Sequence, residues 1–89
     1  MIRDEVIEIL AKKAAALFGI DASTLDENTR FIEDLNCKSA NIVQFTAVLE
    51  DEYDVEVPYM EFEKLATFGE AGDYIGELFG ESFTKRTKQ

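Results

Sequence analysis

The sequence has no histidine, no tryptophan, a single cysteine (Cys37) and a single proline (Pro58) among its 89 residues. Histidine and cysteine are frequent general bases, nucleophiles and zinc ligands, so their scarcity argues against an enzyme and predicts no metal site. One cysteine cannot form an intramolecular disulfide, which excludes a small fold held together by disulfides. The domain must therefore be stabilised by a core built from the apolar residues, which form 46% of the chain.

Long apolar segments are also missing. No segment approaches the roughly 18 consecutive apolar residues that a membrane-spanning helix requires, so we expect no membrane span. The first residues include Asp4, Glu5 and Glu8, whereas signal and transit peptides begin with a basic region. We therefore expect a cytoplasmic protein.

Basic residues are scarce, with 9 against 19 acidic residues and a net charge of -10. Lys85, Arg86 and Lys88 lie at the C-terminal end, so residues 1–84 carry 6 basic and 19 acidic groups, a net charge of -13. This excess argues against nucleic acid as a partner, because phosphate contacts need a positive surface. It favours docking onto basic protein surfaces, although solubility alone would also account for it.

The spacing of apolar residues predicts two long amphipathic helices. The first covers residues 2–18 and ends at Gly19, a suitable C-cap residue. The second covers residues 39–53, with an inward stripe formed by Ile42, Phe45, Thr46, Leu49 and Tyr53. Its solvent-facing side is expected to hold Ala40, Gln44, Ala47 and Asp51, with Asn41 and Glu50 on the flanks.

The remaining segments predict a long loop, a short helix and a final helix. In the loop, 20–38, we expect the apolar group Phe31, Ile32 and Leu35 to hold the segment on the core. Residues 54–58 are expected to be extended, and a short helix at 59–65 should direct Met60 or Phe62, together with Leu65, inward.

The final helix should open with a capping box formed by Thr67 and Glu70. Its expected buried stripe is Phe68, Ala71, Ile75, Leu78 and Phe79, and Gly72 and Gly76 would permit close helix packing. The prediction is an all-α four-helix bundle with three long helices, one short helix and a long first loop. One domain would cover residues 1–80, followed by a polar, flexible tail at 81–89.

Ser39 is the most informative polar residue, because it stands at the start of the second predicted helix. One interpretation is an ordinary N-cap, which contributes about 1 kcal/mol by accepting a hydrogen bond from a backbone amide. The other is a modification site, because a phosphate ester there would lie at the positive end of the helix dipole, close to free amides. The position alone leaves both interpretations open.

The sequence around Ser39 resembles the acyl carrier protein family. The segments that carry the resemblance are LFGI at 17–20, FIEDL at 31–35, IVQF at 42–45, LEDEY at 49–53, VEVP at 55–58 and TFGEAGDYI at 67–75. The order and spacing of these segments match the family along nearly the whole chain.

This resemblance implies that Ser39 carries a covalent 4′-phosphopantetheine, transferred from coenzyme A by a phosphopantetheinyl transferase. The terminal thiol would hold acyl groups as thioesters for acyl-loading and acyl-processing enzymes in fatty acid, polyketide or related lipid biosynthesis. A monomer is implied, since the domain must visit several partners. Family members can shelter the acyl chain among the helices, and periodicity places Phe31, Ile42, Thr46, Met60, Leu65 and Ile75 along such a cleft. An ordinary core role explains these six residues equally well.

The attachment motif itself departs from the family pattern. The family sequence Gly-Ala-Asp-Ser-Leu is replaced by NCKSA at 36–40, so the serine alone is retained and Lys38 reverses a charge. Cys37 stands at the alanine position, where it is expected to fill space rather than to react. The expected partner-binding residues are Lys38, Ala40, Asn41, Gln44, Ala47, Glu50 and Asp51. Because like charges brought together are penalised, these changes indicate a specialised carrier with its own partners.

Two other functions remain open from the sequence. A peptidyl or aminoacyl carrier would share the fold and the prosthetic group but load an amino acid. An unmodified acidic adaptor would keep the bundle and use its acidic residues only for docking.

Overall fold

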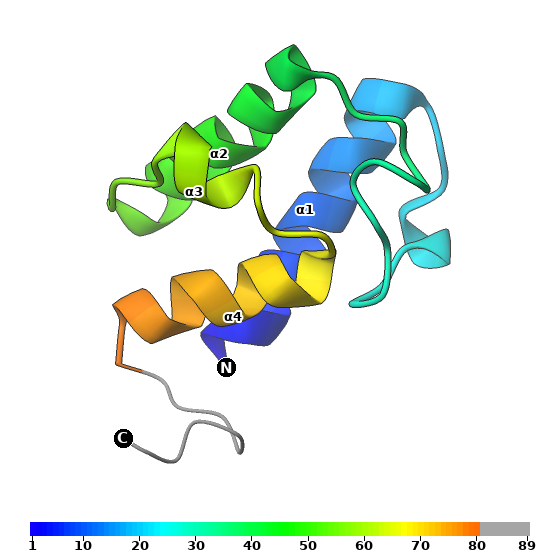
Figure 1. The fold of residues 1–89 in the computed structure, drawn as a ribbon. Helices are drawn as coiled ribbons and strands as arrows, with labels where there is room; N and C mark the ends of the chain where they lie inside the picture. The colour runs from blue at the N-terminus through cyan, green and yellow to red at the C-terminus, as the bar shows by residue number, and fades with distance from the viewer. Residues whose placement is uncertain (81–89) are drawn as a thin grey trace.

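The structure is a computed structural model that describes residues 1–80, and the predicted tail at 81–89 lies outside the described residues. Its elements are α1 (Ile2–Phe18), the 3-10 turn η1 (Ala22–Thr24), α2 (Ser39–Tyr53), α3 (Tyr59–Phe62) and α4 (Phe68–Leu78) (Figure 1). Three helices are long and one is short, which confirms the predicted all-α bundle. Within residues 1–80, no helix is long and apolar enough to cross a membrane.

Helix α1 forms where the amphipathic pattern predicts it. Asp4 and Glu5 lie in its first turn, where negative charge is favourable next to the helix dipole. Gly19 ends the helix with a φ of 68°, and its amide donates to the carbonyl of Ala15. Glycine adopts this left-handed conformation without the steric cost of a side chain, so the helix stops there.

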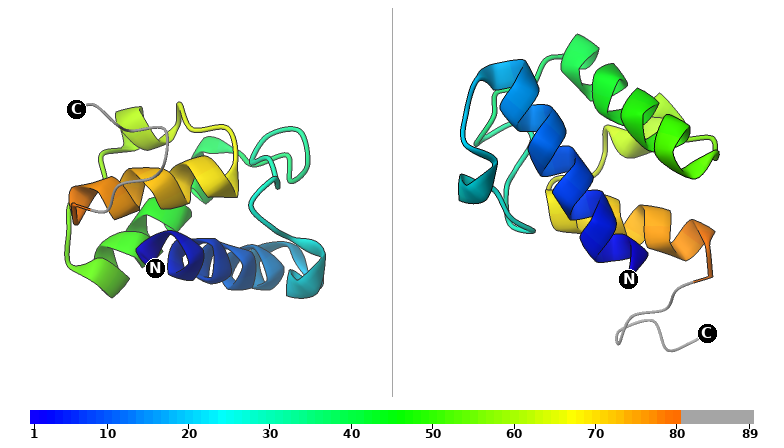
Figure 2. Two further views of the ribbon diagram at one scale, coloured as in Figure 1. Left: turned by 90° about the horizontal axis from the view of Figure 1, so that it is seen from below. Right: turned by 180° about the vertical axis from the view of Figure 1, so that it is seen from behind.

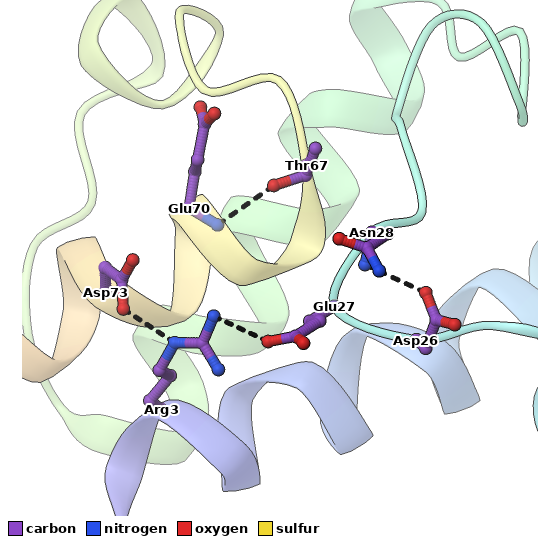
Figure 3. Close-up of polar contacts among 7 residues, drawn as sticks. All are labelled: Arg3, Asp26, Glu27, Asn28, Thr67, Glu70 and Asp73. Carbon is purple, nitrogen blue, oxygen red and sulfur yellow. Dashed lines mark hydrogen bonds and ion pairs between the residues drawn. The ribbon is translucent and has the colours of Figure 1, made fainter.

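Helix α1 packs most extensively against α4, and the two helices cross in Figure 1 and in the right-hand view of Figure 2. Gly72 permits this close approach, because a Cβ at that position would lie 2.8 Å from the carbonyl oxygen of Arg3. The role in helix packing predicted for Gly72 is therefore confirmed. Arg3 also forms ion pairs with Asp73 on α4, at 2.7 Å, and with Glu27 in the first loop, at 2.9 Å (Figure 3).

Phe31 is the centre of the core, although it belongs to the first loop. Its ring lies 5.5 Å from that of Phe45, 5.6 Å from that of Phe62 and 5.2 Å from that of Phe68, measured between centroids. These three rings belong to α2, α3 and α4, so Phe31 joins the loop to three helices. The expectation for Ile32 was wrong, because its side chain is 58% exposed.

Helix α3 is shorter than predicted and ends at Phe62, which is 1% exposed and takes the inward position. The prediction that Met60 or Phe62 points inward is confirmed for Phe62, whereas Met60 is 70% exposed. Two further expectations fail at the end of α4, where Leu78 and Phe79 are 48% and 45% exposed. These residues lie one turn beyond Ile75, where Phe79 keeps a ring contact with Tyr53 at the end of α2, at 5.8 Å between centroids.

The start of α4 shows half of the predicted capping box. Thr67 Oγ1 accepts a hydrogen bond from the amide of Glu70 at 3.1 Å, as expected for an N-cap (Figure 3). The Glu70 carboxylate, however, accepts from the amide of Ala66 at 2.8 Å, one residue earlier than the box requires. Helix α4 is therefore capped by one side chain and fixed to the preceding turn by another.

Candidate modification site at the start of helix α2

The loop that leads to α2 is fixed to the core at two points. The amide of Phe31 donates to the carbonyl of Ala66 at 3.1 Å, next to an isolated β-bridge between Arg30 and Thr67. The amide of Cys37 then donates to the carbonyl of Phe31 at 3.0 Å, so the chain turns back on itself just before α2. Asn36 completes this turn with a φ of 53°, a left-handed conformation that asparagine tolerates better than most residues.

Ser39 is the first residue of α2 and is exposed. The N-cap is Lys38, with a φ of -99° and a ψ of 172°, and its amide donates to Asn41 Oδ1 at 2.9 Å. A lysine side chain has no acceptor, so no side chain caps the amides of the first turn. The interpretation of Ser39 as an ordinary N-cap is therefore wrong, and its hydroxyl takes no part in capping within residues 1–80.

The surroundings of Ser39 are chemically suited to an attached phosphate. The first turn of α2 contains no acidic residue, although the chain as a whole carries a net charge of -10. The positive end of the helix dipole and amides without side-chain caps favour a negative group at this position. Ser39 is also accessible to an enzyme that would modify it.

Cys37 does not share this exposure. It is 6% exposed, and burial raises the pKa of its thiol to about 11. A thiol in that state is a poor nucleophile at neutral pH, because the thiolate is the reactive form. The structure thus agrees with the expectation that Cys37 fills space under the loop.

The predicted partner-binding residues separate into two groups. Five are exposed, and these are Lys38, Ala40, Gln44, Ala47 and Asp51. The other two are half-buried and hold the structure together: Asn41 accepts from the amide of Lys38, and Glu50 Oε2 accepts from the amide of Val57 at 2.8 Å. Glu50 therefore fixes the connector between α2 and α3.

A shallow groove of about 580 Å³ runs along the side of α2 that faces α1. Its lining includes four of the predicted partner-binding residues, Gln44, Ala47, Glu50 and Asp51. Lys13 and Val48 complete the lining. The sequence did not identify these two, because it contains no signal for the side-by-side placement of α1 and α2.

The six residues predicted to line an acyl cleft do not share one environment. Four belong to the packed core: Phe31, Ile42, Thr46 and Ile75. Leu65 is half-buried and lines a separate recess with Tyr74, while Met60 is 70% exposed. Among residues 1–80, the six residues therefore lie in different environments.

A groove of about 360 Å³ nevertheless opens between α2 and the connector that follows it. It is lined by Val43, Thr46, Glu50, Glu56, Val57, Pro58 and Tyr59. Thr46 is the one member of the predicted cleft found there, and its hydroxyl donates to the carbonyl of Val43 at 2.7 Å. Among residues 1–80, no group of three or more potential metal ligands comes together.

Comparison with known proteins agrees with this architecture. The family model described as "Phosphopantetheine attachment site" matches residues 8–75. The acyl carrier protein of Lactobacillus acidophilus is 37% identical over 75 residues, covering 84% of this chain and 94% of the relative. That of Chlamydia felis is 41% identical over 63 residues, covering 71% and 81%.

A solved structure of the acyl carrier protein from Enterococcus faecalis superposes with a TM-score of 0.69 at 35% identity, covering 86% of this chain and 98% of that one. The fold and the matched segment define a phosphopantetheine-bearing carrier domain. The chain belongs to the acyl carrier protein family. It is a carrier rather than a catalyst, and its prosthetic group is a covalently attached 4′-phosphopantetheine.

Proposed function

We propose that Ser39 carries the phosphopantetheine group and that the protein presents acyl groups on it for lipid biosynthesis. The observation that carries the proposal is an exposed serine at the first position of α2, inside the segment matched by the family model. When bound, the group supplies a flexible arm whose terminal thiol holds acyl chains as thioesters. Fatty acid, polyketide and related pathways use carriers of this kind.

In the modification step, the Ser39 oxygen would attack a phosphorus of coenzyme A and displace adenosine 3′,5′-bisphosphate. The hydroxyl proton must pass to a base of the transferase, because the first turn of α2 contains no acidic side chain. The contribution of this chain is then to present Ser39 in an exposed, helical position at the end of a well-anchored loop.

The exposed residues of α2 are proposed to meet the partner enzymes. Lys38, Ala40, Gln44, Ala47 and Asp51 form the accessible part of this face. Asn41 and Glu50 are proposed to act mainly by shaping it, because their side chains accept hydrogen bonds from Lys38 and Val57. A monomer in the cytoplasm fits this role, and the free, buried Cys37 is compatible with that compartment.

An acyl chain is proposed to enter beside Thr46, through the groove between α2 and the connector. Thr46 is 6% exposed yet borders the groove, and Ile42 and Phe45, on the same helix, belong to the core. A small rearrangement of Thr46 would join the groove to the core. Phe31 and Ile75 would then line the deeper part, while Leu65 and Met60 would remain near the surface.

Intact-mass analysis after incubation with coenzyme A and a broad-specificity phosphopantetheinyl transferase tests the attachment. A gain of about 340 Da is expected for the wild-type protein and is lost in Ser39→Ala. Ser23→Ala is a matched control, because Ser23 is also an exposed serine within a helical turn, η1, and this variant should keep the gain. A folded wild-type protein that gains no mass with several transferases would instead favour the unmodified adaptor.

A further inference from the structure

Lys38 is a cation without an ionic partner at the edge of the proposed attachment site. Its side chain is exposed and makes no ion pair within residues 1–80. Its one polar contact is a 3.5 Å hydrogen bond from Nζ to the amide oxygen of Asn36, at the outer limit for such bonds. The ammonium group is therefore free to move toward a stronger acceptor.

The acidic residues of α2 lie far from Lys38 and Ser39. The first acidic residue along α2 is Glu50, eleven positions after Ser39 and therefore about 16 Å away along the helix axis. That distance is about twice the screening length of about 8 Å at physiological ionic strength. In the loop before the site, the carboxylate of Asp34 is already engaged by the amide of Arg30 at 2.8 Å. Within α2, Lys38 and the helix N-terminus are therefore the groups of positive sign next to Ser39, and the first turn has no acidic residue to oppose them.

We propose that Lys38 is the counter-ion of the phosphodiester on Ser39 and fixes the first bonds of the prosthetic arm. This inference rests on the proposed attachment at Ser39. The two residues are adjacent, with Cα atoms about 3.8 Å apart, and a lysine side chain can fold back over that distance. A phosphate oxygen would replace the weak amide contact of Asn36, since charged acceptors form much stronger hydrogen bonds with ammonium groups.

This pairing would change the surface that partners meet. Before modification, the start of α2 presents a free positive charge, and after modification lysine and phosphodiester would form a neutral pair. A partner with an acidic surface would thereby distinguish the unmodified from the modified carrier. A carrier with aspartate at position 38 would instead hold two negative groups together at this position.

The pairing is tested by comparing the unmodified and modified forms of three proteins: the wild type, Lys38→Met and Lys38→Glu. Mass analysis first confirms modification, and urea unfolding at low salt then gives the unfolding constant of each form. Modification is expected to lower the unfolding constant of the wild-type protein by a factor about two to five times larger than the factor for Lys38→Met. This is the size typical of a surface ion pair. Lys38→Glu should be destabilised by modification, and the differences should disappear near 1 M salt, where the screening length is about 3 Å.

Phosphorus NMR measures the environment of the phosphodiester directly, through its chemical shift. Its chemical shift should respond to salt in the wild-type protein and hardly at all in Lys38→Met. Lys64→Met is the matched control, because Lys64 is an exposed lysine in the turn after α3 and the change in net charge is the same; this variant should behave like the wild-type protein. Equal responses of wild type and Lys38→Met in both measurements would overturn the pairing. Absence of the mass gain would overturn the attachment itself, and the pairing with it.

Discussion

The hydroxyl of Tyr74 donates a 2.6 Å hydrogen bond to Glu61 Oε1. This bond joins α4 to α3, which is only four residues long and cannot be stable on its own. Burial raises the pKa of Tyr74 to about 12, and the bond to Glu61 adds to the effect. The protonated phenol is therefore the form that the folded protein favours.

Replacing Tyr74 with phenylalanine is expected to lower the free energy of unfolding by about 1 kcal/mol at neutral pH. In the wild-type protein, Tyr74 contributes to the free energy of unfolding at pH values below its ordinary pKa of 10.0. This contribution is lost as the pH rises toward about 12, the pKa in the folded protein. The variant should therefore lose less stability between these values, as measured by urea unfolding at several pH values. Tyr59→Phe is the control, because the Tyr59 hydroxyl makes no hydrogen bond within residues 1–80; an equal effect would contradict the role of the Tyr74 bond.

Phe31 is expected to dominate the stability of the core, because it contacts three other rings while it is 1% exposed. Phe31→Ala should lower the free energy of unfolding by about 3–5 kcal/mol. If this variant does not fold, the milder Phe31→Leu replaces it in the test, with an expected loss of about 1.5 kcal/mol or less. The neighbouring change Ile32→Ala should cost about 0.5 kcal/mol or less, since this side chain is 58% exposed. Urea denaturation followed by circular dichroism measures all three, and similar costs at both positions would disagree with the structure.

Gly72→Ala should destabilise the protein, although alanine favours helices by about 1 kcal/mol. The new Cβ would lie 2.8 Å from the backbone oxygen of Arg3 and 2.9 Å from Arg3 Cγ, so α1 and α4 must move apart. We expect a net loss of about 1–3 kcal/mol in the free energy of unfolding. Ala16→Gly, at an exposed position of α1, gives the propensity effect alone and should cost about 1 kcal/mol. A more stable Gly72→Ala protein would show that the two helices can separate without cost.

Cys37 should resist alkylation in the folded protein. Its pKa of about 11, against an ordinary value of 9.0, leaves roughly a hundredfold less thiolate near pH 8, and burial blocks access as well. Iodoacetamide labelling followed by mass spectrometry should be at least a hundredfold slower in buffer than in urea. Because the folded state favours the neutral thiol, its contribution to stability should also fall as the pH rises from about 9 to about 11. Rapid labelling of the folded protein would argue for a reactive cysteine.

The helices that carry their own boundary signals could be predicted from the sequence. The bounds of α1 and α2 agree with the predicted 2–18 and 39–53, because periodic apolar residues and a glycine stop act locally. The turn η1 was missed, although Asp21 accepts from the amide of Ser23 in the short Asx turn that an Asp-x-Ser sequence favours.

Periodicity could not predict which residues are covered by other helices. Leu78 continues the apolar stripe of α4, yet it is 48% exposed, because a helical period does not show how far the neighbouring helices cover each turn. The choice of Phe62 over Met60 depends on its contact with Phe31, which is thirty-one residues away in the chain. At the site, Ser39 could be found from the sequence, but the Lys38 cap and the bond from Val57 to Glu50 depend on three-dimensional geometry.

The charges at the ends of α2 have a consequence for the orientation of any partner. Lys38 caps the end where the backbone dipole is already positive, and Glu50, Asp51 and Glu52 lie at the end where it is already negative. Side-chain charges and dipole therefore add together instead of compensating, which leaves tertiary packing to stabilise the helix. Helix α2 therefore carries positive charge at its N-terminal end and negative charge at its C-terminal end. A partner with an acidic patch and a basic patch at the matching separation would align along α2 in one direction. Its active site would then face Ser39 before any close contact forms.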